Sequence, residues 1–572
     1  MIEYRNAWAF LEEYRGKFFT GLWPTIPEMF RITTARYAER PCLTIYEPER
    51  ISLTYRESLA RIEAVARWLH ERGIRKGDKV AVTGKNSPEW AAAYLGILFA
   101  GATVVPIDYQ LRAEEADLLL EASHAVILFV DEEKYDRYEG NPGLRGIVSL
   151  TREKGTYIYD LDGPEAVIEG AADTDLAAIL FTSGTMGKPK GVMLTHRNLV
   201  SDCYLAQGNM LLFPTDVFYA LLPLHHAYTM LAVLIETISV GAEVVFGKRM
   251  VTKAILKDLK EAKITMLLAV PMLFNKVLAG IIRGLREKGP LVYGLISALM
   301  GVSGLIKKIF HVNPGKKMFG FILDKASLTT LRICICGGGP LAPSVFRKYN
   351  QLGLDFVQGY GLTETSPIIN LNPIEYYKET SVGRVLPQVD MKILNPDERG
   401  IGEVIVKGPV VMQGYFELPE ETAASFTEDG YLKTGDVGYM DNEGYLYLTG
   451  RAKNLIVTEG GKNVYPEEIE NEFQLFEEIE QILIRGYELD KKMKTEGIEA
   501  FVFPNPEFNR GGGTNENGAP DPKAQAAVKE RINAIIAEVN QHLLPYQKIA
   551  RTVILDKPME MTTTRKIKRD TV

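Results

Sequence analysis

At 572 residues the chain is too long to fold around a single hydrophobic core, so at least two domains are expected. Its 46% hydrophobic and 24% charged residues are typical of a globular protein and exclude a largely disordered chain. The formal net charge of −7 argues against a general nucleic-acid binder. Four cysteines without zinc-ligand spacing indicate a reducing compartment, and the N-terminus has no signal-peptide pattern, so a cytoplasmic protein is predicted.

Helical and strand patterns alternate from the N-terminal part of the chain onward. A short apolar run predicts a strand at 80–82. Ser87 before Pro88 is typical of a helix N-cap, so we expect a helix over 89–100 and then a strand over 103–106. Repeated units of this kind predict an α/β protein, with parallel-rich sheets and flanking helices in a large N-terminal domain. Ligands of such folds bind beyond the carboxyl ends of the strands.

One loop follows a predicted buried strand, Ile179–Phe181, and is rich in hydroxyls, glycines and lysines. Glycines let the backbone approach an anion closely, and hydroxyls and lysines supply donors and positive charge, so the loop suits a polyphosphate. It differs from a P-loop because Pro189, which has no N–H, follows Lys188. A flexible surface loop is the alternative, which this density of polar groups disfavours. The candidate ATP-binding residues here are Thr182, Ser183, Gly184, Thr185, Gly187, Lys188 and Lys190.

Two stretches further along carry weaker signals. His225 and His226 are adjacent in an apolar context, which leans toward a site. No carboxylate or cysteine accompanies them at ligand spacing, so no metal is predicted there. Gly337 and Gly338 follow an apolar run that is typical of a strand. Their backbone could approach a flat base closely, although a plain turn at a strand end has the same pattern.

A more specific pattern lies at 356–365, where a ring, a hydroxyl and a carboxylate project from a loop that contains Gly361. Tyr360 can stack on an adenine face, Thr363 can donate to a phosphate, and Glu364 is a hard oxygen ligand suited to Mg²⁺. The order of these residue types is much less frequent by chance than a glycine run, so it favours a nucleotide site.

The last third of the chain contains a predicted domain boundary. Asp436 follows a Thr-Gly turn, where an isolated aspartate would more often only cap the backbone. A strand pattern ends near Arg451 and a new segment begins after it. The residues from 451 to 572 are predicted to form a small α+β domain.

In this order and over nearly the whole chain, these stretches resemble the adenylate-forming superfamily of acyl-CoA synthetases, luciferases and adenylation domains. The resemblance implies a domain boundary at about Gly450. Residues 1–450 would bind ATP and the acyl substrate, and residues 451–572 would be a small mobile lid that carries the catalytic lysine. It also implies that His226 lies beside the substrate carboxylate, that Asp436 accepts from the ribose hydroxyls and that Arg451 reaches the ribose. The other implied roles are Thr363 on the α-phosphate, a hinge at Lys453 and a thiol channel at Gly460 and Gly461.

The basic C-terminal segment matches the superfamily's catalytic-lysine motif, with Lys566 at the position of the lysine. Thr563 and Arg565 stand where members usually have proline and a small or apolar residue. Without the resemblance, such a tail would be interpreted as a solvated terminus or as a segment attracted to an anionic surface.

The sequence around 461–466 and 564–569 looks most like long-chain acyl-CoA synthetases. The implied reaction is AMP-forming: ATP activates a long-chain fatty acid as an acyl-adenylate, and the acyl group is then transferred to coenzyme A with release of AMP. Mg²⁺ would be held by Glu364, and no nucleic-acid partner is expected. The alternatives within this chemistry are an acyl-ACP synthetase or another acyl-AMP ligase. A luciferase-like oxygenase and an inactive membrane-binding or partner-binding homologue are further alternatives.

One apolar segment, 291–310, does not belong to these motifs. Its three glycines and its length disfavour a transmembrane span. Leu305 and Phe310 beside Lys307 and Lys308 instead indicate an interfacial helix that contacts a membrane peripherally. An insertion packed against the core explains the pattern equally well.

Overall fold

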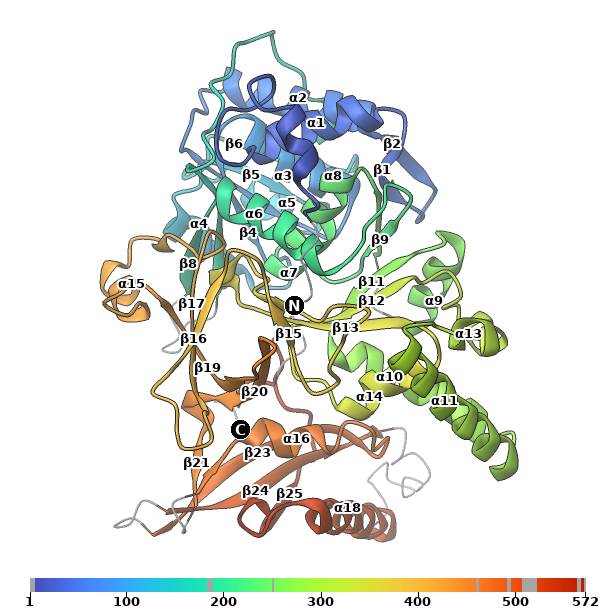
Figure 1. The fold of residues 1–572 in the computed structure, drawn as a ribbon. Coiled ribbons are helices and arrows are strands. Elements are labelled where there is room, and N and C mark those ends of the chain that lie inside the picture. Colours follow the sequence, from blue (N-terminus) through green and yellow to red (C-terminus); the bar gives the residue numbers. More distant parts are fainter. Residues whose placement is uncertain are drawn as a thin grey trace.

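The fold is taken from a computed structural model of the chain. The structure describes residues 6–182, 189–248, 251–458, 462–490, 495–506, 522–562 and 567–569. Two large sheets with surrounding helices make up most of the molecule, and a smaller three-stranded sheet lies in the C-terminal part (Figure 1). The predicted α/β class, with a large N-terminal region of sheets and helices, is confirmed.

The first large sheet is mostly parallel. Its strands, in spatial order, are β18 (Gly414–Tyr415), β8 (Lys190–Thr195), β7 (Leu176–Thr182), β4 (Thr103–Ile107), β3 (Lys79–Thr83), β5 (Ile127–Val130) and β6 (Gly146–Ser149). Pairing is parallel from β7 to β6 and antiparallel between β7 and β8 and between β8 and β18. The polyphosphate-loop candidate therefore connects two adjacent strands, β7 and β8.

Local capping explains where the helices beside this sheet begin. The backbone N–H of Trp90 donates to the Ser87 hydroxyl at 3.0 Å, and Pro88 opens α3 (Pro88–Phe99) as predicted. After β8, the N–H of Asn198 donates to the Thr195 hydroxyl at 3.0 Å and begins α6 (His196–Ala206). Because both helices are buried over most of their length, these caps fix the position of the core beside the sheet.

The second large sheet joins a parallel half to an antiparallel half. Its strands, in order, are β16 (Asp390–Leu394), β17 (Gly402–Lys407), β19 (Leu432–Met440), β20 (Tyr445–Arg451), β15 (Gly383–Val385), β14 (Asn370–Leu371), β13 (Asp355–Tyr360), β12 (Ile333–Cys336), β11 (Met266–Ala269), β9 (Val217–Ala220), β10 (Glu243–Phe246), β1 (Pro41–Ile45) and β2 (Ile51–Thr54). Strands from β13 to β1 pair in parallel, and those from β13 to β16 pair antiparallel. The second half is antiparallel because its strands are joined mostly by loops, without the crossover helices that parallel pairing requires.

The C-terminal part has its own small core. Its elements are β21 (Ile456–Val457), β22 (Asn463–Val464), α16 (Pro466–Asn471), β23 (Ile479–Asp490), β24 (Thr495–Pro504), α18 (Pro522–His542) and β25 (Arg551–Ile554). Apolar side chains such as Ile469, Ile484 and Ile535 form a cluster separate from the cores of the large sheets. A separate core is what a domain boundary near Gly450 requires, although the boundary itself stays a prediction.

The remaining helices cover the sheets and connect their strands. They are α1 (Ile26–Tyr37), α2 (Tyr55–Glu71), α4 (Ala113–Ser123), α5 (Glu132–Tyr138), α7 (Ala227–Thr229), α8 (Glu236–Val240), α9 (Thr252–Glu261), α10 (Pro271–Arg286), α11 (Pro290–Phe310), α12 (Gly315–Met318), α13 (Gly320–Lys325), α14 (Pro343–Gln351) and α15 (Pro419–Ser425). A π-helical turn, Met230–Ile235, joins α7 to α8. Such turns are frequent at functional sites, and this one lies directly after the two histidines.

Candidate active site

A cavity of about 2600 Å³ is lined by residues of both large sheets and of the C-terminal part. The predicted site residues that the structure describes all line it, although they come from strands and loops far apart in the sequence. They are Thr182, Lys190, His226, Gly337, Gly338, Tyr360, Gly361, Thr363, Glu364, Asp436, Arg451 and Lys453. The others lie outside the described residues: Ser183, Gly184, Thr185, Gly187, Lys188, Gly460, Gly461 and Lys566.

Asp436 is the centre of a three-residue polar cluster in this cavity. Its Oδ2 accepts a hydrogen bond of 2.7 Å from the Tyr360 hydroxyl, and its Oδ1 lies 2.9 Å from Nε of Arg451. Arg451 meets Asp436 because the two are direct partners across the antiparallel pair β19–β20. Burial, together with the Asp436 charge, raises the pKa of Tyr360 well above its usual range, so its hydroxyl remains a donor. The carboxylate is thus held at the cavity wall with its charge balanced.

Two of the predicted glycines lie in close packing, which is prohibitive for a side chain at Gly361 and tight at Gly337. A Cβ at Gly361 would lie 1.7 Å from the carbonyl oxygen of Pro367, so no other residue fits this backbone. A Cβ at Gly337 would lie 3.0 Å from the ring of Tyr228, whose hydroxyl donates to the Ile335 carbonyl at 3.1 Å. Both glycines therefore have a structural role, which is independent of any bound base.

Glu364 is oriented by a residue that the sequence analysis did not select. The Tyr415 hydroxyl donates to Oε1 of Glu364 at 2.9 Å, and Nζ of Lys190 lies 4.9 Å from the centre of the Tyr415 ring. Tyr415 reaches this place because β18 pairs with β8, with Tyr415 opposite Val192. The arrangement puts a carboxylate and a lysine on the same part of the cavity wall.

The two histidines have a carboxylate neighbour after all. Nε2 of His225 lies 3.1 Å from Nε2 of His226 and 3.4 Å from Oδ1 of Asp108. Asp108 directly follows β4, and no spacing in the sequence connects it with residues 225 and 226. The sequence argument against a metal here, that no carboxylate accompanies the histidines, therefore does not hold in space. One donor atom from each residue lies within 4.8 Å of the others, close enough to hold a metal ion together.

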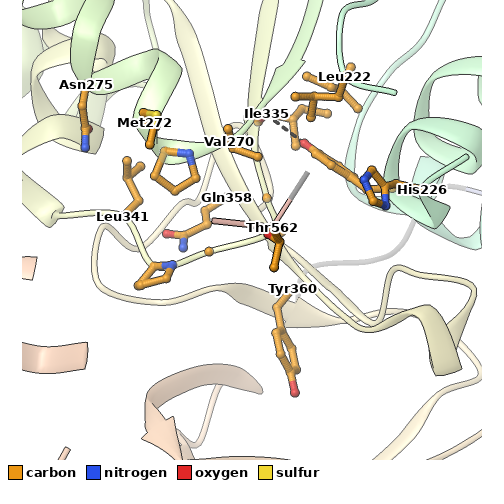
Figure 2. Close-up of a pocket in the computed structure, with 18 of the residues that line it drawn as sticks. Leu222, His226, Val270, Met272, Asn275, Ile335, Leu341, Gln358, Tyr360 and Thr562 are labelled. Carbon is orange, nitrogen blue, oxygen red and sulfur yellow. Dashed lines mark hydrogen bonds between the residues drawn. The ribbon is translucent and has the colours of Figure 1, made fainter. Parts of the chain in front are cut away.

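The C-terminal segment reaches the same cavity. Figure 2 shows Thr562 among the lining residues, next to Gln358 and above Tyr360 in this view. Thr562 and Ile567, which flank the undescribed residues 563–566, both line it. The segment is fixed by Arg569, whose guanidinium donates to the two carboxylate oxygens of Glu470 at 2.7 and 2.6 Å. Burial raises the pKa of Glu470 to about 7, and the Arg569 charge opposes that shift.

Another part of the cavity is apolar. Its wall is formed by side chains of β11, α10, the π-helical turn and neighbouring segments, and includes Leu222, Ala232, Met266, Leu268, Val277 and Ile281. Glu236 lies among them, and burial raises the pKa of its carboxyl group to about 8 and keeps it neutral at pH 7. Neither Glu236 oxygen has a hydrogen-bond partner among the described residues. Lys276, Arg283, Lys288 and Lys325 also line the cavity, so a ligand along α10 would meet apolar side chains with cationic groups among them.

Three residues of this site were missed from the sequence. Asp108 carried a usable signal, because it directly follows a strand of a parallel sheet, where ligands bind. Tyr415 and Glu236 carried none, since only the pairing of β18 with β8 and the π-helical turn bring them to the cavity.

The comparisons with known proteins agree with this geometry. The sequence model of the family described as AMP-binding enzyme matches residues 30–416, more than half of the chain, so the protein belongs to that family. It is 29% identical over 561 residues to the long-chain-fatty-acid–CoA ligase FadD15 of Mycobacterium bovis, covering 91% of this chain and 90% of that protein. It is also 28% identical over 528 residues to a long-chain-fatty-acid–CoA ligase of Bacillus subtilis, covering 84% and 85%.

Relatives with other substrates are equally similar. A feruloyl-CoA synthase of Amycolatopsis sp is 29% identical over 446 residues, which cover 76% of this chain and 80% of that protein. Among solved structures, ATP-bound MatB from Rhodopseudomonas palustris superposes with a TM-score of 0.73 at 26% identity, covering 96% and 98% of the two chains. MenE of Bacillus subtilis, an o-succinylbenzoate CoA synthetase in complex with its acyl-adenylate, gives 0.73 at 25% identity, covering 95% and 97%. An AMP-forming acid–CoA ligase reaction fits this family, and its acid substrate differs among the relatives.

Proposed function

We propose that this protein is a fatty acid–CoA ligase that activates a long-chain acid with ATP and transfers the acyl group to coenzyme A. The acid and ATP would give an acyl-adenylate and pyrophosphate, and the thiol of coenzyme A would then displace AMP. The observation that carries the proposal is one cavity with a polar nucleotide part around Asp436 and an apolar part along β11 and α10. His226 lines the same cavity and lies near Leu222 (Figure 2), and the acid's carboxylate would face the α-phosphate there.

The main difficulty of adenylation is electrostatic, because two anions must approach each other. Lys190 and the described Thr182, together with the undescribed residues 183–188, would bind the β- and γ-phosphates. Asp436 and Arg451 would hold the ribose, while Tyr360 would face the adenine. Groups fixed before the reaction stabilise developing charge without reorganising, and losing one such donor costs roughly 100- to 1,000-fold in rate.

The carboxylate of Glu364 is suited to bind Mg²⁺. It offers a hard carboxylate oxygen, and the Tyr415 hydroxyl fixes its orientation at the cavity wall. The ion would neutralise charge on the ATP phosphates. The chain's own contribution is the oriented carboxylate of Glu364 beside the cationic Lys190.

The length of the acid is inferred from the apolar part of the cavity. Its lining includes Leu222 and Met266, residues of α10 as far as Leu285, and Phe321. Burying methylene groups of the substrate there would add roughly 0.8 kcal/mol each, so affinity should rise with chain length. A compact aromatic acid such as ferulate would leave most of this surface without contacts.

The two half-reactions are proposed to use two orientations of residues 451–572. In one, Lys566 would contact the α-phosphate, and in the other the segment around 460–461 would line a path for the thiol. Lys453 would be the hinge. Its place in a short 3₁₀ turn (Ala452–Asn454) between β20 and β21 supports this assignment, because few residues need to change conformation there.

The experiment is ATP–pyrophosphate exchange with fatty acids of graded length, and ferulate as the contrasting acid. Exchange that increases with chain length up to a long-chain optimum is expected, followed by thioester formation with coenzyme A. If none of the acids supported exchange, or if only ferulate did, the proposal would be contradicted. Comparing coenzyme A with holo-acyl carrier protein as the acceptor separates the ligase from an acyl-ACP synthetase.

A further inference from the structure

α11 is apolar on two faces, although only one of them is buried. Ile296, Met300, Ser303 and Lys307 form its buried face, which packs against α14 and α10. The opposite side, which we call the outer face, carries Leu291, Leu295, Leu299, Val302, Leu305 and Ile309, all exposed. These positions are three or four residues apart, so they make one continuous stripe. The helix lies at the edge of the molecule, outside α10 and α14 (Figure 1).

The exposure is concentrated here and not spread over the protein. Of the 25 exposed large hydrophobic side chains in the described part of the chain, 11 lie between Leu291 and Phe321. Leu291 is 88% exposed and Phe310 is 67% exposed. Single exposed apolar residues need no explanation, but a contiguous patch of this kind marks a binding surface.

The charge of the segment that contains α11 favours an anionic partner. Between residues 271 and 325 there are nine lysines and arginines and two acids, a formal charge of +7 in a chain whose total is −7. Of these cations Lys307 is buried and paired with Asp355, whereas Lys308 is exposed next to Ile309 of the outer face. Lys288, Lys317 and Lys325, in the segments that flank α11, are exposed as well. An apolar helix face flanked by lysines is the pattern that binds an anionic membrane surface.

Lys307 does not take part in that pattern, which corrects the sequence interpretation. Its ammonium group is buried and donates to Oδ1 of Asp355 at 2.7 Å and to Oδ1 of Asn350 at 2.8 Å. This ion pair anchors α11 to the large domain. By length and composition α11 is also the one described helix that could cross a bilayer. The packed face and the Lys307 anchor instead keep it lying along the protein.

The patch is continuous with the apolar part of the cavity. Phe321 is 59% exposed and also lines that cavity, as do the exposed Lys288 and Lys325. We propose that the outer face of α11 docks the protein onto an anionic membrane surface, with the cavity's α10–α13 end facing the lipid. A consequence, which rests on the proposed function, is that an apolar acid could pass from the bilayer to the cavity without crossing water.

The test is flotation of the purified full-length protein with vesicles, in the absence of ATP and acid. One set of vesicles is phosphatidylcholine and the other contains phosphatidylglycerol as well. The outer-face variant is Leu295→Glu/Leu305→Glu/Ile309→Glu. A matched control, Leu22→Glu/Val167→Glu/Leu544→Glu, adds the same charge at exposed apolar positions elsewhere. A third variant, Lys308→Glu/Lys317→Glu, changes only the cations.

Wild type and control are expected to bind the anionic vesicles, with binding that weakens as salt is added. The outer-face variant should bind roughly tenfold less, and the lysine variant should lose the preference for anionic lipid. No vesicle binding by wild type, or equal binding by wild type and the outer-face variant, would overturn the proposal. A wild-type dimer that the outer-face variant converts to monomer, without vesicle binding, would also overturn it and assign the face to a second copy. Because no substrate is present, these outcomes do not depend on the proposed reaction.

Discussion

The hydroxyl of Tyr360 donates a 2.7 Å hydrogen bond to Asp436, and so joins the end of β13 to β19 in the wall of the cavity. The other Asp436 oxygen is occupied by Arg451. Ribose hydroxyls would therefore bind a carboxylate whose position is already fixed from two sides. A site held in this way loses little conformational freedom when ATP binds.

Asp436→Ala should weaken ATP use in the adenylation step. A lost charge-assisted hydrogen bond costs about 1.5–3 kcal/mol, which corresponds to a fall in kcat/KM for ATP of roughly 10- to 150-fold. ATP–pyrophosphate exchange measures it, and the preferred acyl length should not change. Tyr360→Phe is the matched comparison, because it removes the hydroxyl but keeps the carboxylate and the ring, and a smaller loss is expected. Unaltered ATP kinetics in Asp436→Ala would remove this residue from the site.

Asp108 should act on the reaction through the histidine pair. It lies 3.4 Å from His225, which contacts His226. Asp108→Asn keeps the shape and removes the charge, and loss of a net interaction of about 1 kcal/mol predicts a roughly fivefold lower kcat/KM for the acid. The KM for ATP should stay the same. The exposed Asp117→Asn is the control for charge, and an equal fall in both variants would contradict a positioning role for Asp108.

Glu236 should make the protein less stable as pH rises. Its pKa is raised by burial from an ordinary 4.5 to about 8, so between these values the folded state keeps a proton that the unfolded state has lost. The contribution of Glu236 to the free energy of unfolding is therefore fully present below pH 4.5. It declines as the pH rises to about 8, by at most about 5 kcal/mol. Asp202 of α6, also buried with its pKa raised by burial and by Glu236, would add a decline of the same sign.

Glu236→Gln isolates the contribution of this carboxyl group. The variant should resemble wild type near pH 5 and be the more stable protein at pH 8, as measured by urea unfolding at both values. A difference between the two proteins that does not change with pH would show that Glu236 ionises normally in the folded state. Because Glu236 helps to raise the Asp202 pKa, the comparison is repeated with Asp202→Asn in both proteins, and the difference due to Glu236 should persist.

The sequence was sufficient for those parts of the fold that rest on local chemistry. Ser87 and Pro88 predicted the start of α3, because a cap needs only neighbouring residues. The antiparallel half of the second sheet was not predicted, because strand order depends on pairing between residues far apart in the chain. Lys307 was assigned to the membrane-facing side for the same reason, since Asp355 is 48 residues away.

In the site, the residues that belong to local motifs could be predicted from the sequence. The residues that lie outside those motifs could not. Tyr360, Glu364 and Asp436 each carry a chemical type in a recognisable local pattern. Tyr415 contacts Glu364 across the sheets, and no local pattern records that contact. Asp108 has a local signal, its place directly after a strand, but that signal does not predict its contact with His225. The supporting residues of a site are therefore the part that requires the three-dimensional structure.

Substitutions at Lys566 and at Lys453 should each impair a different half-reaction. Lys566 is proposed to contact the α-phosphate only during adenylation, and Thr562 and Ile567 on either side of it line the cavity. An interaction made in one transition state lowers only that barrier. Lys566→Ala should therefore abolish most acyl-adenylate formation, yet convert supplied acyl-adenylate and coenzyme A into thioester at nearly the wild-type rate.

Lys453→Pro should show the reverse behaviour. Proline fixes φ and removes an N–H at the proposed hinge, which obstructs the rotation needed for the thiol step but leaves the phosphate loop unchanged. Lys557→Ala is the control for the loss of one positive charge in Lys566→Ala, because Lys557 is exposed and lies in the same part of the chain. Each half-reaction is measured separately, by pyrophosphate exchange and by thioester formation from supplied acyl-adenylate. If Lys566→Ala lost both steps equally while its circular dichroism stayed normal, the assignment of Lys566 to one orientation would be wrong. If it lost neither, the basic segment would be only a solvated terminus.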